Sequence, residues 1–432
     1  MLTIAAHTLG CKVNQYDTQA MLELFQREGY QIVSMEQTAD VYLVNTCTVT
    51  GTGDKKSLQL IRKIRREHPG ASLIVCGCMA QERGSDLLSV GADLVIGTQR
   101  RSEVVILLNQ VRETGQPLCA VEPLQQGQPF ECLAITTQNE HTRATLKIQE
   151  GCDNHCSYCI IPSVRGPVRS RPLEDIRNEV ARLSLAGFME IVLTGIHLCS
   201  YGRDLNPALS LLDVIRLVQE QDGILRIRLG SLEPTVATPA FAAELRKMDK
   251  ICPQFHLALQ SGSDTVLARM RRRYNSAQYL QAVDNLRREF PFAAFTTDIL
   301  TGFPGETETE FEETKAMIRK VGFSRIHVFP YSARPHTPAA AMPGQLSSAE
   351  KERRARELIA LGNQVSKEYL TGWIGRETSL LPEEKVEDHW EGYTPEYIRV
   401  RLDSVSGCVP GTPVRIRLIS AGPRLMSGRI IE

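Results

Sequence analysis

Three cysteines lie within eight residues in the segment Cys152-Asp-Asn-His-Cys156-Ser-Tyr-Cys159. Thiolates at this spacing can bind three irons of a four-iron cubane and leave the fourth iron open to a small molecule. A structural zinc site is the alternative, but it normally takes four protein ligands in a closed geometry. His155 would complete such a set, although it lies between two of the thiols on a tight loop. The spacing therefore predicts a [4Fe-4S] cluster on Cys152, Cys156 and Cys159.

A second set of thiols is scattered along the first hundred residues. Cys11, Cys47 and Cys78 each follow an apolar run that is typical of a buried strand. The carboxyl ends of parallel strands lie at one edge of a sheet, so these side chains are expected to converge on one crevice. Small neighbours such as Gly10 and Gly77 suit a loop that approaches a cofactor closely. We predict a second cluster here, again with one open iron; three inert, buried thiols are the alternative.

Six of the twelve cysteines belong to neither set, and five of these have no partner spacing. The sixth, Cys76, lies two residues before Cys78 and could face the same side. Cys76 ends an apolar run and is expected to be buried in its strand. No run of about 18 apolar residues and no basic leader are seen, so neither a membrane span nor a signal peptide is expected. We therefore expect a cytoplasmic protein, in which thiols stay reduced and serve metal or redox chemistry rather than disulfides. The remaining five are expected to be ordinary buried or linker thiols: Cys119, Cys132, Cys199, Cys252 and Cys408.

The composition is that of a folded protein of several domains. The chain has 432 residues, 42% of them hydrophobic, and 50 basic residues balance 50 acidic ones. This excludes disordered and collagen-like classes, and the length favours roughly three domains. A net charge of zero argues against a protein that coats nucleic acid non-specifically, but it leaves room for a locally basic face.

Residues 1–113 alternate short apolar runs with helical stretches, which predicts a parallel sheet with helices on both faces. Residues 114–140 lack periodicity and are expected to form a linker. The expected strands are Leu2–Ala6, Val41–Val44, Leu73–Val75 and Leu94–Ile96. The expected helices are Asn14–Glu28, Lys55–Glu67 and Glu82–Ser89.

The alternation resumes in residues 141–370, where about six strand–helix units predict a partial barrel. Barrels of this kind place their chemistry at the carboxyl ends of the strands, where Cys152 and its neighbours are expected. A charged amphipathic helix over residues 347–369 is expected to end this unit. The expected strands are Thr145–Gln149, Glu190–Leu193, Leu225–Leu229, Phe255–Leu259, Ala294–Ile299 and Ile326–Phe329, with helices such as Leu173–Ala186 and Glu308–Lys320 between them.

Residues 371–432 change to period-two patterning with Gly-Pro punctuation, which predicts a small antiparallel β-barrel. Its second half carries six arginines against one acidic residue, Asp403. Trp390 and Tyr393 near its start would stack on unpaired bases, which favours binding of single-stranded RNA. A solvated barrel with two ordinary core aromatics is the alternative. The arginines are Arg399, Arg401, Arg415, Arg417, Arg424 and Arg429.

These segments resemble the radical S-adenosylmethionine (SAM) methylthiotransferases over essentially the whole chain. The segment Glu150-Gly-Cys-Asp-Asn-His-Cys-Ser-Tyr-Cys-Ile-Ile-Pro162 is similar to the radical-SAM motif of that family. Leu9-Gly-Cys11-Lys, Asn45-Thr-Cys47-Thr and Gly77-Cys78-Met-Ala are similar to its N-terminal domain, and the tail resembles the RNA-binding barrel called TRAM. Further similarity lies in Gln260-Ser-Gly-Ser263, Met270-Arg-Arg-Arg-Tyr274 and Thr297-Asp-Ile-Leu-Thr-Gly-Phe-Pro-Gly-Glu306.

Within that family, the phrase His7-Thr-Leu-Gly-Cys-Lys-Val-Asn-Gln-Tyr-Asp-Thr18 most resembles the branch that acts on threonylcarbamoyladenosine in tRNA. The branch acting on isopentenyladenosine usually shows Phe-Gly-Cys-Gln-Met-Asn. The branch modifying a ribosomal-protein aspartate usually shows Leu-Gly-Cys-Pro-Lys-Asn. Both remain alternatives, and an iron–sulfur electron-transfer or binding module is the alternative of another class.

The resemblance implies a radical reaction. A reduced cluster on Cys152, Cys156 and Cys159 would bind SAM at its open iron, and the adenosyl radical would take the hydrogen from C2 of an adenine at position 37 of a tRNA anticodon loop. The cluster on Cys11, Cys47 and Cys78 would present the sulfur, and a second SAM would supply the methyl group. A flavodoxin- or ferredoxin-type reductant is the implied electron donor.

Strand ends of the predicted barrel would hold SAM. Gln260 and Ser261 would meet its ribose or carboxylate, and Glu233 would accept a hydrogen bond from an amine or hydroxyl. For each position the alternative is an ordinary strand-terminal turn or helix cap. The further candidates are Thr194, Gly195, Gly302 and Gly305.

Overall fold

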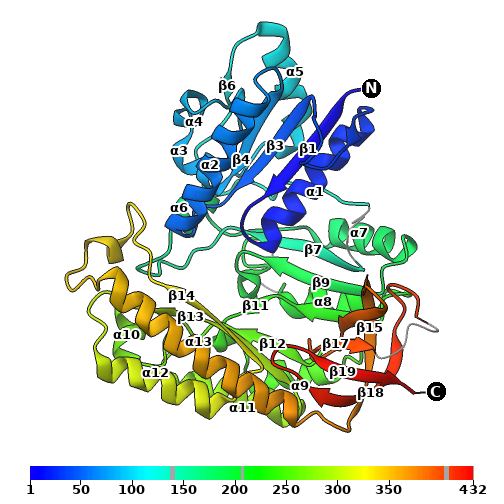
Figure 1. The fold of residues 1–432 in the computed structure, drawn as a ribbon, viewed down its shortest axis with the longest axis vertical. Coiled ribbons are helices and arrows are strands. Elements are labelled where there is room, and N and C mark those ends of the chain that lie inside the picture. The colour runs from blue at the N-terminus through cyan, green and yellow to red at the C-terminus, as the bar shows by residue number, and fades with distance from the viewer. Residues whose placement is uncertain (137–141, 206–208, 403–407, 432) are drawn as a thin grey trace.

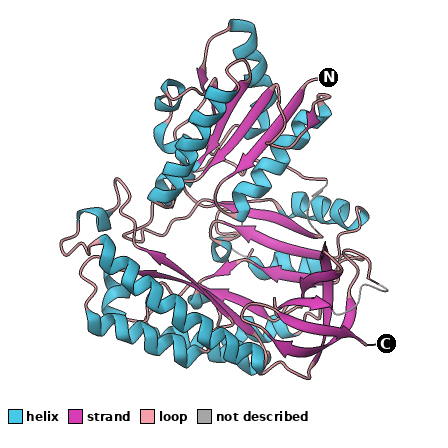
Figure 2. Cartoon of the chain, viewed as in Figure 1, coloured by secondary structure: helices cyan, strands magenta, loops and turns pink. Residues whose placement is uncertain are grey.

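The computed structural model describes residues 1–136, 142–205, 209–402 and 408–431. Three units follow one another along the chain (Figure 1): an N-terminal α/β sandwich, a central strand–helix unit and a small C-terminal barrel beside the latter. Figure 2 shows helices on both faces of the first sheet and a row of helices along the outside of the second unit. The predicted α/β class and the order of units are confirmed.

The N-terminal sheet is parallel throughout, with strand order β2-β1-β3-β4-β5-β6. Alternate residues of its strands enter two separate cores: Val41 and Leu43 pack with α1 and α5, whereas Tyr42 and Val44 pack with α2. The elements are β1 (Thr3–Thr8), α1 (Lys12–Arg27), β2 (Gln31–Ile32), β3 (Val41–Thr46), α2 (Gly51–Glu67), β4 (Ser72–Gly77), α3 (Cys78–Arg83), α4 (Asp86–Ser89), β5 (Leu94–Val95), η1 (Arg101–Glu103), α5 (Val104–Thr114) and β6 (Leu118–Cys119).

Two expectations for this unit differ from the structure. The helix expected over Glu82–Ser89 is two short helices, because Gly84 between them has a left-handed φ of 51° and ends α3. Part of the expected linker forms β6, which extends the sheet beside β5. Residues 137–140 of that linker lie outside the described residues.

The central unit is a partial barrel built from two four-stranded sheets, β10-β9-β7-β8 and β11-β12-β13-β14, joined by a bridge between Ile227 and Ile251. Its elements before α9 are β7 (Arg143–Glu150), α6 (Ile161–Arg165), β8 (Arg169–Ser170), α7 (Leu173–Leu185), β9 (Glu190–Gly195), η2 (Leu198–Ser200), α8 (Leu211–Gln219), β10 (Arg226–Leu229), β11 (Ser231–Leu232) and η3 (Pro234–Val236). The others are α9 (Pro239–Arg246), β12 (Gln254–Leu257), α10 (Asp264–Arg269), α11 (Ser276–Glu289), β13 (Ala294–Thr301), α12 (Glu308–Val321), β14 (Arg325–Pro330), η4 (Pro338–Ala341) and α13 (Ser348–Thr371).

All six predicted barrel strands exist within two residues of their expected ends, in parallel register. The sequence pattern did not predict β8, which is antiparallel to β7, or β11. Both have only two residues, which is too short for any periodicity. Ala144, Leu146 and Ile148 of β7 pack in one core with helix α7, so these alternate residues face the helices outside the barrel, and Lys147 and Gln149, which alternate with them, face the other way.

The C-terminal unit is a closed barrel in the order β15-β16-β17-β19-β18. The expected antiparallel pairing holds except between β17 and β19, which are parallel. Asp403 lies outside the described residues. The strands are β15 (Glu377–Val386), β16 (His389–Tyr393), β17 (Arg399–Leu402), β18 (Val414–Ala421) and β19 (Met426–Ile430).

Candidate functional site

Cys11, Cys47 and Cys78 lie at the carboxyl ends of β1, β3 and β4, which are neighbours in the sheet. Cys11 caps the N-terminus of α1 and Cys78 is the first residue of α3. Gly10 has a φ of 109°, and a Cβ atom there would lie 2.9 Å from Cys47 Cβ. The loops after β1 and β3 are therefore in direct contact, and a side chain at position 10 would force them apart.

The three thiols act on one another electrostatically. Burial raises the pKa of Cys78 to about 11, against the attraction of the Arg165 guanidinium, and Cys11 and Cys47 raise it further. Burial likewise raises the pKa of Cys47, to which Cys11 also contributes. All three cysteines are free. Binding of a metal cluster would therefore have to release protons from these thiols.

Asn14 holds two of these loops together. Its amide nitrogen donates to Leu9 O at 2.8 Å and to Thr46 O at 3.0 Å, one acceptor in each of the loops that carry Cys11 and Cys47. Its side-chain oxygen accepts from Arg165. Asn14 ends the three-residue phrase after Cys11, but its positioning contacts could not be predicted from the sequence, because both acceptors are backbone carbonyls.

The loop of Cys152, Cys156 and Cys159 follows β7, and backbone bonds anchor it on both sides. Cys152 N–H donates to Gly166 O at 3.0 Å, and Ser157 N–H donates to Met270 O at 3.0 Å. Burial raises the pKa of Cys152 to about 11 and that of Cys159 to about 12, with the neighbouring thiols adding to both shifts. The three thiols are thus close enough to act on one another electrostatically.

Glu233 lies against this loop. Its carboxylate accepts from Asn154 Nδ2 and from Arg272 Nη2, each at 3.1 Å, and lies 3.3 Å from His197 Nε2. Burial opposes ionisation, but His197 and Arg272 outweigh it and hold the pKa of Glu233 below its usual value. Glu233 therefore remains a charged hydrogen-bond acceptor beside Cys156.

Arg272 also reaches the thiols directly, since its Nη1 lies 3.3 Å from Cys156 Sγ. Its guanidinium carbon is 4.9 Å from the ring centroid of Tyr274. The sequence analysis missed both Arg272 and His197. The run Arg271-Arg-Arg273 looks like a solvated basic patch, and only its middle member turns inward.

A buried ion network joins the two thiol sites. Arg165 Nε donates to Cys78 Sγ at 3.1 Å, and its Nη1 lies 3.0 Å from Glu150 Oε2 and 3.3 Å from Asp17 Oδ2. Lys147 Nζ bridges the same two carboxylates at 2.7 and 2.6 Å. Asp17 comes from α1 of the N-terminal unit and Glu150 lies two residues before Cys152. The network therefore fixes one set of cysteines relative to the other.

The other predicted SAM contacts are at strand ends, as expected, but their surroundings differ. Gln260 has a left-handed φ of 64°, and its backbone bonds Asp298 and Leu300 of β13. Ser261 is fully buried, and its hydroxyl lies 3.3 Å from that of Thr314. In this structure Ser261 therefore faces α12 rather than open space.

Thr194 is buried at the end of β9, and Gly195 allows Gln149 of β7 to approach closely. Gly302 N–H donates to Glu306 Oε2 at 2.7 Å, and Gly305 N–H donates to Gly344 O at 2.8 Å. These two glycines thus build a turn that packs on the segment before α13.

The candidate RNA residues divide into two groups. Trp390 packs against the core of the small barrel, as expected for an ordinary core aromatic rather than for a residue that stacks on RNA bases. Tyr393 stacks on Tyr397, with ring centroids 4.6 Å apart. All six arginines are exposed. Arg415 and Arg417 pair with Glu377, and Arg399 pairs with Glu384 at 3.0 Å.

The donor sets have the chemistry that an iron–sulfur cluster requires. Each is a group of three soft thiols with a guanidinium N–H directed at one sulfur, Arg165 at Cys78 and Arg272 at Cys156. Within the described ranges, no three His, Cys, Asp or Glu side chains converge on a single metal ion. That finding concerns mononuclear sites such as zinc, since each thiol of a four-iron cluster binds a separate iron.

In the described part of the chain, no helix is both long and apolar enough to cross a membrane.

Comparison with known proteins defines the class first. Residues 3–97 match the Uncharacterized protein family UPF0004, and residues 146–318 match the Radical SAM superfamily. A solved structure of a radical S-adenosylmethionine methyltransferase, TsrM from Kitasatospora setae, shares the fold with a TM-score of 0.59 and 14% identity. That similarity covers 78% of this chain and 74% of TsrM. The partial barrel is therefore that of a radical SAM enzyme.

Sequence relatives then give the family. Threonylcarbamoyladenosine tRNA methylthiotransferase MtaB of Bacillus subtilis is 41% identical over 100% of this chain and 97% of its own length. The tRNA-2-methylthio-N(6)-dimethylallyladenosine synthase of Moorella thermoacetica is 34% identical over 98% of this chain and 97% of its own length. The chain belongs to the radical SAM methylthiotransferase family.

Proposed function

We propose that this chain converts N6-threonylcarbamoyladenosine at position 37 of tRNA, next to the anticodon, to its 2-methylthio derivative. The observation that carries the proposal is the 41% identity, over the whole chain, to the Bacillus subtilis enzyme named for that substrate. The dimethylallyladenosine synthase of Moorella thermoacetica is less similar, at 34%. The phrase Lys12-Val-Asn14 agrees with this choice of branch.

In this proposal one [4Fe-4S] cluster is held by Cys152, Cys156 and Cys159 and a second by Cys11, Cys47 and Cys78. When bound, the clusters and SAM supply the radical and sulfur chemistry that an unreactive aromatic C–H bond requires. The effect of the thiols of each set on one another's pKa supports the assignment.

Residues of this chain would bind SAM and hold the cysteine loops in position. Glu233, kept ionised by His197 and Arg272, would accept a hydrogen bond from the amine or a hydroxyl of SAM. Asn14 and Arg165 hold the loops of the second site in place. Because Arg165 and Glu150 are almost fully buried, water is kept away from the ion network between the two sites.

The remaining assignments follow the division of the chain. Residues 1–113 would bind the second cluster, residues 141–370 would bind SAM, and residues 371–432 would bind RNA through the exposed arginines, with 114–140 between the first two. A flavodoxin- or ferredoxin-type reductant in the cytoplasm would supply electrons. Equal numbers of acidic and basic residues mean that RNA binding depends on this local concentration of positive charge.

Mass spectrometry of tRNA nucleosides tests the substrate directly. Cells that lack this protein should accumulate N6-threonylcarbamoyladenosine and lose its 2-methylthio form, while 2-methylthio-isopentenyladenosine stays unchanged. Loss of the isopentenyl product instead would move the chain to the other branch. Purified Cys47→Ala should still cleave SAM without forming product, whereas Cys156→Ala should not cleave it.

A further inference from the structure

A cavity of about 380 Å³ lies where the three units of the fold meet. Lys12 and Gln15 of α1 line it from the N-terminal unit, Arg143 of β7 from the central barrel, and Tyr393 and Tyr397 from the small barrel. We call this space the junction cavity. Its size falls in the range of small-molecule sites, roughly 300–1,000 Å³. Lys12 directly follows Cys11, so the cavity borders the loop of the proposed second cluster.

The aromatic wall of the junction cavity is rigid and cationic. The rings of Tyr393 and Tyr397 stack 4.6 Å apart, at an angle of 19°. The Arg143 guanidinium carbon lies 4.8 and 5.2 Å from the two ring centroids, and that of Arg228 lies 4.7 Å from Tyr397. Tyr397 has a left-handed φ of 63°, a backbone conformation that costs about 1 kcal/mol and that such packing must hold in place.

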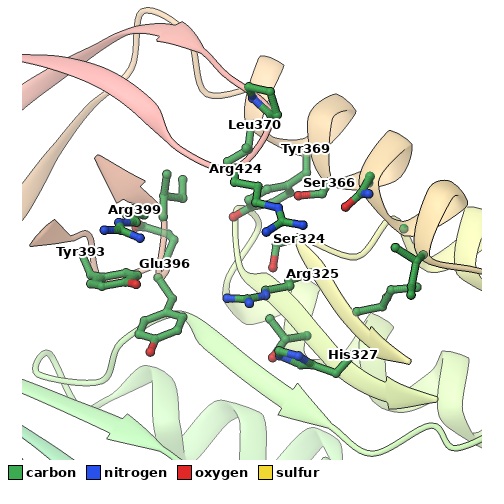
Figure 3. A pocket seen from close by; sticks show the side chains of 18 residues that line it. Ser324, Arg325, His327, Ser366, Tyr369, Leu370, Tyr393, Glu396, Arg399 and Arg424 are labelled. Carbon is green, nitrogen blue, oxygen red and sulfur yellow. The ribbon is translucent and has the colours of Figure 1, made fainter. Parts of the chain in front are cut away.

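Figure 3 shows the far side of this wall, where Tyr393 and Arg399 line a second cavity of about 330 Å³ between the small barrel and β14. Arg325 and His327 of β14 lie across that cavity from Tyr393 and Arg399. The wall therefore separates two polar spaces at the base of the central barrel. Only the junction cavity touches the N-terminal unit among the described residues.

Of the three cationic side chains that line the junction cavity, two form ion pairs with glutamates of the lining and one does not. Arg143 Nε lies 2.5 Å from Glu383 Oε1, and Arg399 Nη2 lies 3.0 Å from Glu384 Oε1, so both arginines of the lining are paired. Lys12 forms no ion pair with any residue that the structure describes; the charges that act on it are more distant.

Behind the lining, Arg226 and Arg228 share a single carboxylate, that of Glu190, at 3.5 and 2.7 Å. The excess of positive charge is seen at Tyr397. Burial would raise the pKa of this phenol, but Arg143, Lys12 and Arg228 outweigh burial and lower it. The junction cavity thus has the potential of an anion-binding site.

We propose that the junction cavity binds the N6 substituent of the substrate adenosine and that the ammonium of Lys12 pairs with the carboxylate of its threonyl group. This inference rests on the proposed function. The threonylcarbamoyl group carries one negative charge, one hydroxyl and amide groups, and these match a cavity with one unpaired cation and several polar side chains. Lys12 is then the residue that selects this substituent.

The same cavity rejects the rival substrate. A dimethylallyl group has no charge and no hydrogen-bonding atoms, so it would enclose Lys12 and Gln15 without a partner. A site built to bind a polar group discriminates strongly against an analogue that lacks it, because its own polar atoms are then left unpaired.

Binding of short RNAs tests this assignment on full-length protein with both clusters reconstituted. Three anticodon stem-loops that differ only at the target adenosine are needed: N6-threonylcarbamoyl, its carboxyl methyl ester, and dimethylallyl. We expect the wild type to bind the acid about tenfold or more tightly than the ester, the value of a charged hydrogen bond. Lys12→Met should bind acid and ester equally, and Lys12→Arg should keep the preference.

Lys247→Met is the matched control, since Lys247 is exposed directly after α9 and, among the described residues, pairs only with Glu244 of that helix. It should discriminate as the wild type does. The iron content of Lys12→Met should also be measured. A value equal to that of the wild type would show that the substitution leaves the adjacent Cys11 undisturbed.

A Lys12→Met protein that keeps the wild-type ratio of acid to ester affinity would overturn the inference. The two proposals fail separately. If the wild type forms no 2-methylthio product from the threonylcarbamoyl RNA, the proposed function is wrong. If the wild type forms that product and Lys12→Met still discriminates, only the assignment of the cavity is wrong.

Discussion

Replacing Asp17 by Asn removes a carboxylate that three buried cations share between the N-terminal unit and the barrel. Lys147 lies 2.7 Å from Asp17, Arg165 lies 3.3 Å away, and Arg101 also pairs with it. Without this charge, Lys147 and Arg165 keep only Glu150 as a carboxylate partner among the residues that the structure describes. Breaking a buried network in this way costs about 3–5 kcal/mol, a large part of the 5–15 kcal/mol that stabilises a typical domain.

Thermal unfolding followed by circular dichroism measures this loss. Asp17→Asn should lower the unfolding midpoint by about 10 °C. Glu352→Gln is the surface control: Glu352 is 67% exposed and lies 3.9 Å from Arg356, a pair worth at most about 1 kcal/mol. Equal midpoints for the two variants would refute the claim that the network holds the units together.

The same network makes the stability of the fold depend on pH. Burial alone would raise the pKa of Asp17, but Arg101, Lys147 and Arg165 outweigh it and hold that pKa below its usual value; the pKa of Glu150 is likewise held well below its usual value. A carboxylate with a depressed pKa in the folded state stabilises the fold above its unfolded pKa of about 4, and this stability is lost as the pH falls further. Acid should therefore destabilise the wild type more steeply than Asp17→Asn.

Three further outcomes are expected. Gly10→Ala would bring its Cβ to 2.9 Å from Cys47 Cβ, so the variant should lose iron from the second site while still cleaving SAM; a wild-type iron content contradicts this. Arg272→Met removes the N–H directed at Cys156 Sγ and should change the electron paramagnetic resonance signal of the reduced first cluster, which an unchanged spectrum would disprove. Arg415→Gln with Arg417→Gln should reduce the salt dependence of tRNA binding by about two counterions, and an equal slope would remove these residues from the RNA interface.

Point variants are preferable to deleting the tail, because the small barrel is part of the central unit's structure. Arg226 Nη1 donates to Tyr393 O at 3.0 Å, and Arg228 Nη1 donates to Pro395 O at 2.9 Å. Removing residues 371–432 would take these carbonyl acceptors away and leave the two guanidiniums only the shared carboxylate of Glu190 among the described residues, which costs stability as well as RNA binding.

The sequence predicted what depends on periodicity and on chain order. The strands before Cys11, Cys47 and Cys78 each contain a short apolar run of the kind that buried parallel strands show, so their parallel order and the common edge of the three thiols could be predicted. The loop of Cys152 was evident from spacing alone. Short elements such as β8 escaped because two residues show no period.

Contacts between units could not be predicted in the same way. The direction in which Arg165, Arg272 and Lys12 point depends on the packing of other segments, which the local sequence around each residue does not reveal. A one-dimensional pattern gives no sign that Arg165 reaches Cys78, 87 residues away. Buried charges of this kind are visible only once the units are assembled.

Iron counting on anaerobically reconstituted protein tests the central claim most directly, namely that two separate sets of three thiols each hold a four-iron cluster. The wild type should contain about eight irons per chain, and each triple Cys→Ala variant, at 11/47/78 or at 152/156/159, about four. About four irons in the wild type, or an unchanged count after replacing Cys11, Cys47 and Cys78, would contradict the account.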